Sequence, residues 1–273
     1  MSELVDLYKT RCKYQISDTI QELDFKFDID RLRKELFDFI KRNQFGFGPV
    51  SLKLPPGQFN YTSKDEMLET GGIDAINYLK DVCTPSNIRH NNEYLDWHPD
   101  LKNSYTKLLA VEIENLCGLH IGRVRLGWLQ PGNGYPMHCD LEPMRLHIPL
   151  FTNNLAYIIQ YDKLYNMKYG KLYHLITTDL HTAWNFGNLP RLHLIFSTYA
   201  DKLLDEEINK LRQKKVTAKN FASIIKDQGV DRYSLLELLK IKDTDVHIDS
   251  ETKLDMLHKI KAITEILADT KSI

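Results

Sequence analysis

The spacing of hydrophobic and polar positions divides the chain into three stretches. In the first, residues 1 to about 118, alternation over Ile20–Phe27 predicts a strand. Asp28 is suited to cap a helix that follows it, and Tyr105–Cys117 predicts a second helix. The apolar stripe of the first helix consists of Leu32, Leu36, Phe37 and Ile40. We expect these helices to brace a larger structure.

The middle stretch, residues 119–199, is a succession of short apolar runs separated by turn residues. Its breaks include Pro131–Gly134 and Gly187–Pro190. Many short strands at close spacing are typical of an antiparallel sandwich or barrel. The runs are Ile121–Leu129, Met137–Leu141, Arg145–Phe151, Leu155–Tyr161, Lys171–Thr177, His181–Asn185 and Arg191–Thr198.

The last stretch returns to helical spacing. Between Glu251 and Ala268, apolar residues recur on one side of a predicted helix. We therefore expect two domains, a barrel domain over residues 1–200 and a small helical domain over 201–273. The apolar stripe of the last helix suits either a core or a dimer contact, so monomer and homodimer both stay open.

Composition excludes several classes of protein. The 273 residues are 42% hydrophobic and 27% charged, as in ordinary globular proteins. A net charge of −1, from 36 basic and 37 acidic residues, gives no general attraction to nucleic acid or anionic membranes. A bilayer-spanning helix needs about 18 apolar residues without a charge, and the sequence contains no such stretch. Four scattered cysteines and a charged N-terminus predict a cytoplasmic protein with reduced thiols.

The first candidate for chemistry is the segment His138-Cys139-Asp140. On a strand, residues i and i+2 point to the same face, so the imidazole and the carboxylate would lie side by side. The same triplet occurs at His98–Asp100 and at His247–Asp249, but only the middle copy is flanked by strand patterning. Taken alone, such a triplet is more often an ordinary hydrogen-bonded pair at the mouth of a barrel than a metal site.

Two later residues change this picture. His181 follows Asp140 by 41 residues at the start of a predicted strand, and Arg191 lies ten residues further, across a turn. A third nitrogen ligand completes the two-histidine, one-carboxylate set that holds non-haem Fe(II) with open positions. An arginine offers a planar fork to a carboxylate. The pattern predicts a site for a metal and a dicarboxylic co-substrate, with His174 as the rival third ligand.

The stretch from Arg123 to Ser197 resembles the Fe(II)- and 2-oxoglutarate-dependent oxygenases. It is most similar to the aspartyl/asparaginyl β-hydroxylase-like group, which includes bacterial free-proline hydroxylases. The residues that carry the resemblance are His138, Asp140, His181, Arg191 and the segment Arg145-Leu-His147-Ile-Pro-Leu150. It implies a mainly β fold with flanking helices, built on a double-stranded β-helix (a cupin-like jelly roll).

The resemblance also implies residue roles. His138, Asp140 and His181 would bind Fe(II), and Arg191 would pair with the far carboxylate of 2-oxoglutarate, helped by Arg145 or His147. With O2, the enzyme would hydroxylate an amino acid, either free (such as proline) or in a polypeptide, and release succinate and CO2.

Two other functions fit the same residues. One is a cupin-type metal- or ligand-binding module without turnover. The other is a metal-dependent hydrolase or isomerase on the same barrel. In every case we expect a small-molecule or peptide ligand, and neither nucleic acid nor membrane as a partner.

Overall fold

The computed structural model describes most of the barrel region and part of the N-terminal region. The described residues are 14, 17, 20–47, 49–58, 72–74, 93–134, 138–140, 144–160, 163–177 and 181–199. At 72–74, 138–140 and 163 the description covers the backbone alone. The predicted helical domain, 201–273, lies outside the described residues.

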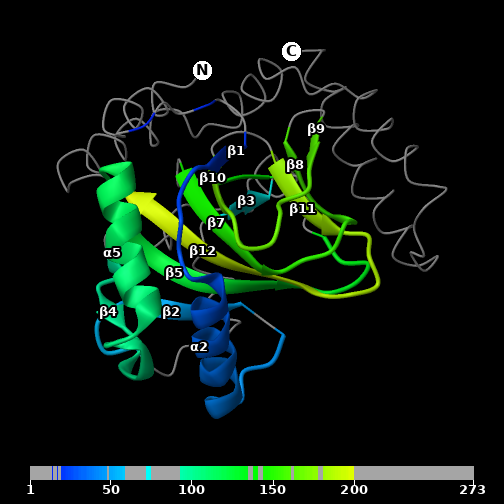
Figure 1. Cartoon of the computed structure of the whole chain (residues 1–273). Helices are drawn as coiled ribbons and strands as arrows, with labels where there is room; N and C mark the ends of the chain where they lie inside the picture. Colours follow the sequence, from blue (N-terminus) through cyan, green and yellow to red (C-terminus); the bar gives the residue numbers. More distant parts are fainter. Residues whose placement is uncertain are drawn as a thin grey trace.

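A seven-stranded antiparallel sheet forms the centre of the molecule (Figure 1). Its middle strands, β7, β12 and β5, are long and consist almost entirely of buried residues. In spatial order the sheet contains β1 (Gln21–Leu23), β10 (Leu172–Ile176), β7 (Met144–Phe151), β12 (Arg191–Tyr199), β5 (His120–Leu129), β2 (Val50–Leu54) and β4 (Asp96–Trp97).

A second, five-stranded sheet lies on one side of the first. All of its neighbouring strands pair antiparallel. In spatial order it contains β3 (Gly72–Asp74), β6 (His138–Asp140), β11 (His181–Asn185), β8 (Ala156–Gln160) and β9 (Lys163–Tyr165). From β5 to β12, successive strands change sheet at every step except between β8 and β9, which is the arrangement of a jelly roll. The mainly β, jelly-roll fold is thus confirmed.

Two helices cover the opposite side of the larger sheet (Figure 1). They are α2 (Ile29–Arg42) and α5 (Tyr105–Cys117), and a short 3₁₀ turn, η3 (Pro99–Leu101), precedes α5. The helices begin where the sequence predicts, because the side chains of Asp28 and Ser104 accept hydrogen bonds from the first-turn amides.

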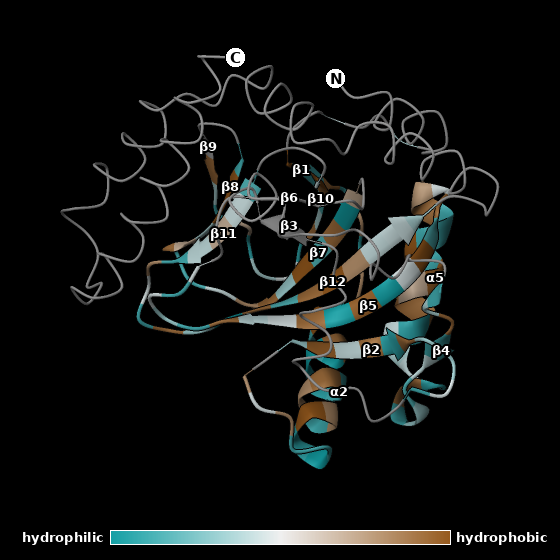
Figure 2. Cartoon of the chain, turned by 180° about the vertical axis from the view of Figure 1, so that it is seen from behind, coloured by the Kyte–Doolittle hydropathy of each residue, from teal (hydrophilic) through white to brown (hydrophobic). Residues whose placement is uncertain are grey.

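The main hydrophobic core lies between these helices and the larger sheet. Leu36 of α2 and Ile113 of α5 pack there with Leu146, Leu194 and their neighbours. Figure 2 shows the corresponding hydrophobic bands, in brown, on the helices and on the strands that they cover. One face of each long strand therefore packs in this core.

A smaller apolar cluster defines the inner face of the jelly roll. It joins Leu129 and Leu175 of the larger sheet to Ile158 and Ala183 of the smaller sheet. Side chains on this face therefore point into the space between the two sheets.

The structure corrects some local expectations. The first strand spans only Gln21–Leu23 rather than Ile20–Phe27, because Phe25 and Phe27 pack against the helix-side core instead of joining the sheet. In α2 the buried residues include Phe39, which the predicted stripe lacked. Strands β2, β3, β4 and β9 were not predicted. In the described part of the chain, no helix is long and apolar enough to span a membrane.

Candidate active site

Three of the predicted site residues share the inner face of the larger sheet. Arg145 lies opposite Leu175 in the β7–β10 pair, and Arg191 lies opposite Leu129 in the β12–β5 pair. Both leucines belong to the cluster between the sheets, and residues directly opposite each other share a face. His147, two residues after Arg145, is on the same face.

The predicted metal ligands meet on the smaller sheet. The backbone register of β11 and β6 sets His181 directly opposite His138. Ala183 belongs to the inner cluster, so His181, two residues earlier, lies on the inner face, and position 138 shares that face. Asp140 follows at i+2 on the same strand. The tertiary structure thus brings together positions that are more than 40 residues apart in sequence.

The rival ligand His174 lies elsewhere. It is fully buried in β10 directly opposite Leu146, which belongs to the core under the helices, and its ring makes an edge contact with Tyr14. His174 is therefore on the helix side of the larger sheet, away from His181.

The described side chains of the site are buried and rich in positive charge. Arg145 and Arg191 are 5% and 3% exposed, and His147 is equally buried. Burial is the main cause that holds the pKa of His147 well below its usual value, and the nearby charges of Arg191, Arg145 and Arg125 act in the same direction. His147 is therefore neutral at pH 7, beside three guanidinium groups.

Sequence reasoning missed two residues of this inner face. His193 lies two residues after Arg191 on β12, so the alternation of the strand could have revealed it. Gln160 lies opposite His181 on β8, and its side-chain amide donates to the backbone oxygen of Ile176 at 3.0 Å. No local signal marks Gln160, because its position depends on the pairing of two distant strands.

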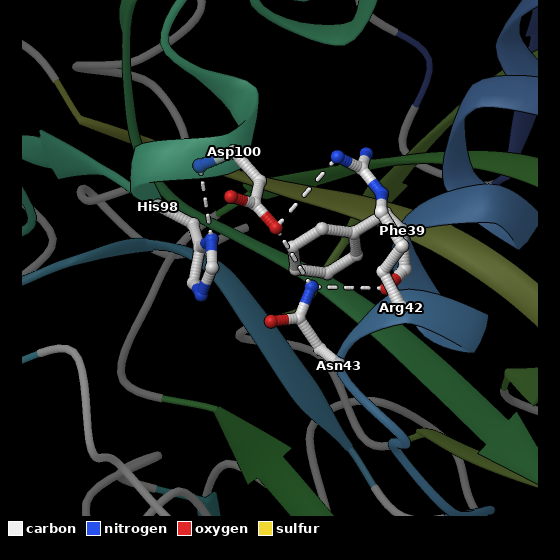
Figure 3. A network of polar contacts seen from close by, with 5 residues as sticks. All are labelled: Phe39, Arg42, Asn43, His98 and Asp100. Carbon is white, nitrogen blue, oxygen red and sulfur yellow. Dashed lines mark hydrogen bonds and ion pairs between the residues drawn. The ribbon is translucent and has the colours of Figure 1, made fainter.

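The triplet His98–Asp100 has a structural role (Figure 3). The Nδ1 atom of His98 accepts a hydrogen bond from the backbone amide of Asp100 and so caps η3. Asn43, at the end of α2, donates to a carboxylate oxygen of Asp100 at 3.0 Å, and Phe39 packs edge-on against the His98 ring. These contacts fasten the end of α2 to the turn before α5. They contain no metal-binding arrangement.

The residues present fit the group that the resemblance implies. Two histidines and one aspartate, at positions on two neighbouring strands of one sheet, are the residue types that non-haem Fe(II) prefers. No three histidine, cysteine or acidic side chains form a metal-binding group among those that the structure describes. The side chains of His138 and Asp140 are not among them, so the fit rests on the strand register.

Comparison with known proteins agrees with this geometry. Residues 96–200 match the family model described as aspartyl/asparaginyl beta-hydroxylase. In sequence, the chain matches no curated protein.

Several solved structures are similar over most of the chain. A prolyl-4-hydroxylase from Pseudomonas putida is 12% identical over 72% of this chain and 94% of its own, with a TM-score of 0.36. AviO1 from Streptomyces viridochromogenes is 14% identical over 74% and 96%, with a TM-score of 0.37. A 2OG-Fe(II) oxygenase family oxidoreductase from Burkholderia pseudomallei is 12% identical over 67% and 99%, with a TM-score of 0.29.

The family match spans α5 and the strands that carry all six predicted site residues. This part of the chain, residues 96–200, is therefore similar to the aspartyl/asparaginyl β-hydroxylase family.

Proposed function

We propose that the protein is an Fe(II)- and 2-oxoglutarate-dependent dioxygenase that hydroxylates an amino acid, free or within a polypeptide. One observation carries this proposal. The strand register sets His138 against His181 on the same inner surface that holds Arg145, His147 and Arg191. Metal-ligating residue types and carboxylate-binding residue types thus face one space.

His138, Asp140 and His181 would hold the metal. The position of His181 opposite His138 in an antiparallel pair puts their Cβ atoms about 5 Å apart, which suits two ligands of one ion. Fe(II), when bound, would supply together with 2-oxoglutarate and O2 the oxidising power for C–H hydroxylation, with release of succinate and CO2.

Arg191 would bind the far carboxylate of 2-oxoglutarate. Its guanidinium group is a rigid fork that matches a carboxylate, and burial strengthens the attraction because little water screens it. Arg145 adds positive charge, and His147 offers a neutral imidazole for a hydrogen bond. These groups would orient the co-substrate toward the metal positions and exclude water from the reaction.

The deciding experiment measures succinate released from 2-oxoglutarate by the purified protein with Fe(II), ascorbate and pools of free amino acids. Succinate that rises with one amino acid and disappears in His138→Ala identifies the substrate as a free amino acid. Weak turnover without added substrate, also lost in His138→Ala, identifies the oxygenase and directs the search to peptides. Absence of turnover with iron bound contradicts the proposal and favours a binding module or a hydrolase.

A matched pair of histidines tests the ligand assignment. His181→Ala should abolish turnover and weaken Fe(II) binding under anaerobic conditions. His174→Ala removes an equally buried histidine on the opposite face of the larger sheet and should keep Fe(II) affinity. The assignment of His181 is wrong if the two variants bind iron equally well.

The variant Arg191→Ala distinguishes binding of the co-substrate from binding of the metal. We expect it to lose measurable 2-oxoglutarate binding in calorimetry while Fe(II) binding survives, because in the proposed site the guanidinium group binds the co-substrate and is not a metal ligand. Unchanged 2-oxoglutarate affinity would exclude this role.

A further inference from the structure

A second buried histidine, His193, lies on the same face as His147, and the two rings are in contact. The Nδ1 atoms of His147 and His193 lie 3.3 Å apart, and the two rings meet edge to face at 86°. His193 is 1% exposed. On the inner face of the larger sheet it lies opposite Pro149 of β7 and Gly127 of β5, so it is held from both sides.

Both imidazoles are neutral at physiological pH. Burial holds the pKa of His193 well below its usual value, and the charge of Arg191 lowers it further. The pKa of His147 is lowered for the same reasons. A hydrogen bond between two neutral imidazoles needs one Nδ1 atom that carries hydrogen and one that does not, so the rings must be opposite tautomers.

The Nε2 atoms decide which tautomer each ring adopts. Both Nε2 atoms are buried, and neither has a hydrogen-bond partner among the described residues. The charges of Arg191, Arg145 and Arg125 all act on the His147 ring, whereas Arg191 is the one arginine that acts on the His193 ring. An anion held by these arginines would therefore meet His147, and it requires a donor there.

We propose that His193 is a positioning residue that donates from its Nδ1–H to Nδ1 of His147, and thereby fixes His147 as the tautomer whose Nε2–H points to the co-substrate carboxylate. This inference rests on the proposed function for the identity of the anion. The arrangement of the two tautomers concerns the protein alone. Because the Nε2–H donor of His147 would already have a single orientation, the ring would not need to rearrange when the anion binds.

The first test determines the tautomers of His147 and His193 in the absence of any ligand. Long-range ¹H–¹⁵N correlation spectra of metal-free protein labelled at its 10 histidines distinguish a protonated Nδ1 from a protonated Nε2. We expect His147 to carry hydrogen on Nε2 and His193 on Nδ1, with assignments from His147→Gln and His193→Asn. The reverse pattern, or a charged ring at pH 7.5, would overturn the proposal.

The second test uses a conservative rescue. An asparagine amide occupies roughly the place of Nδ1 of histidine, whereas a glutamine amide occupies that of Nε2. His193→Asn should keep the Nε2–H tautomer of His147 and bind 2-oxoglutarate within about threefold of the unaltered protein. His193→Gln should mix the tautomers and weaken binding about tenfold, as loss of one ordered hydrogen bond to a charged group predicts.

A control separates this effect from general damage to the sheet. His174→Asn alters a buried histidine on the other face and should leave both the His147 spectrum and 2-oxoglutarate affinity unchanged. If Asn and Gln at position 193 weaken binding equally, His193 is only a packing residue. If the tautomers are as expected but the unaltered protein does not bind 2-oxoglutarate, the proposed function fails and the positioning role stands.

Discussion

The side chain of Asn185 determines where the strand carrying Arg191 begins. It is fully buried at the end of β11, where its Nδ2 atom donates to the backbone oxygens of Leu129 and Leu189, at 3.0 Å and 2.7 Å. Its Oδ1 atom accepts from the amide of Gly187 and from the side chain of Asn153. One amide thus ties the β11–β12 turn to the end of β5.

We expect Asn185→Ala to lower the free energy of unfolding by about 2–4 kcal/mol, because it removes the side-chain partner of two buried backbone groups, the oxygen of Leu129 and the amide of Gly187. Urea denaturation measures the loss. Leu189→Ala is the control: its exposed side chain is removed while its backbone oxygen stays, so the change should be within about 0.5 kcal/mol. A similar small loss in both variants would show that the turn forms without Asn185.

Residue-scale predictions from the sequence succeed where the signal is local. Asp28, which the sequence predicts as a helix cap, accepts a hydrogen bond from the backbone amide of Arg31. His193 escaped notice because it sits in an apolar run, Leu192–Phe196, without a motif around it. Its partner, His147, is distant in sequence, and only the pairing of β12 with β7 reveals it.

At the scale of elements, a carboxylate on α2 caps the beginning of α5. Glu35 of α2 accepts hydrogen bonds from the backbone amides of Tyr105 and Thr106, at 2.7 Å and 2.9 Å, and from the hydroxyl of Thr106. These amides belong to the first turn of α5, which otherwise lacks intrahelical acceptors. The negative charge also suits the positive end of the helix dipole.

Glu35→Ala should therefore destabilise the protein by about 1–3 kcal/mol, since it frees two first-turn amides and a hydroxyl. Asp38→Ala, in the same helix but exposed, should change the free energy of unfolding by no more than about 0.5 kcal/mol. Both values come from urea denaturation at pH 7.5. Equal effects would mean that α5 is held by its apolar face alone.

The same scale shows which elements the sequence predicts. Both helices and most barrel strands agree with the patterning, because caps, turn residues and periodicity act within a few residues. The short strands β2 and β4 escaped prediction because they exist through pairing with β5 and with each other. The first strand was predicted too long for a related reason: only Gln21–Leu23 finds a partner, in β10.

At the scale of the whole molecule, the site requires burial of positive charge and neutral histidines between two sheets. The folded pKa values of His147 and His193 lie well below their unfolded values of about 6.5. The unfolded chain therefore binds more protons than the folded protein below that pH. The stability contributed by the neutral imidazoles is complete above about pH 6.5 and is lost as the pH falls.

We expect the free energy of unfolding to fall below pH 6.5, by up to about 1.4 kcal/mol per pH unit for each of these histidines. Urea denaturation between pH 7.5 and 5.5 measures the slope. His193→Asn should show a shallower slope because one of the two groups no longer titrates. An unchanged slope would show that other groups cause the acid sensitivity.

The sequence by itself determined the elements, the turns between them and the residue types available for a site. The resemblance also assigned roles to six residues, and the structure sets all six positions on the inner surface of the jelly roll. Whether those roles are real stays a prediction for the iron-binding and co-substrate experiments.

Only the tertiary structure decided which histidines face the site. Every residue of β10 and of β11 is buried, so neither strand shows the polar–apolar alternation that would reveal its inner face. The burial pattern of the two strands therefore does not show which of His174 and His181 faces the site. Strand register separates them, because a shift of one residue would turn every side chain to the opposite face. Pairing with β7 turns His174 to the helices, and pairing with β6 and β8 turns His181 to the site.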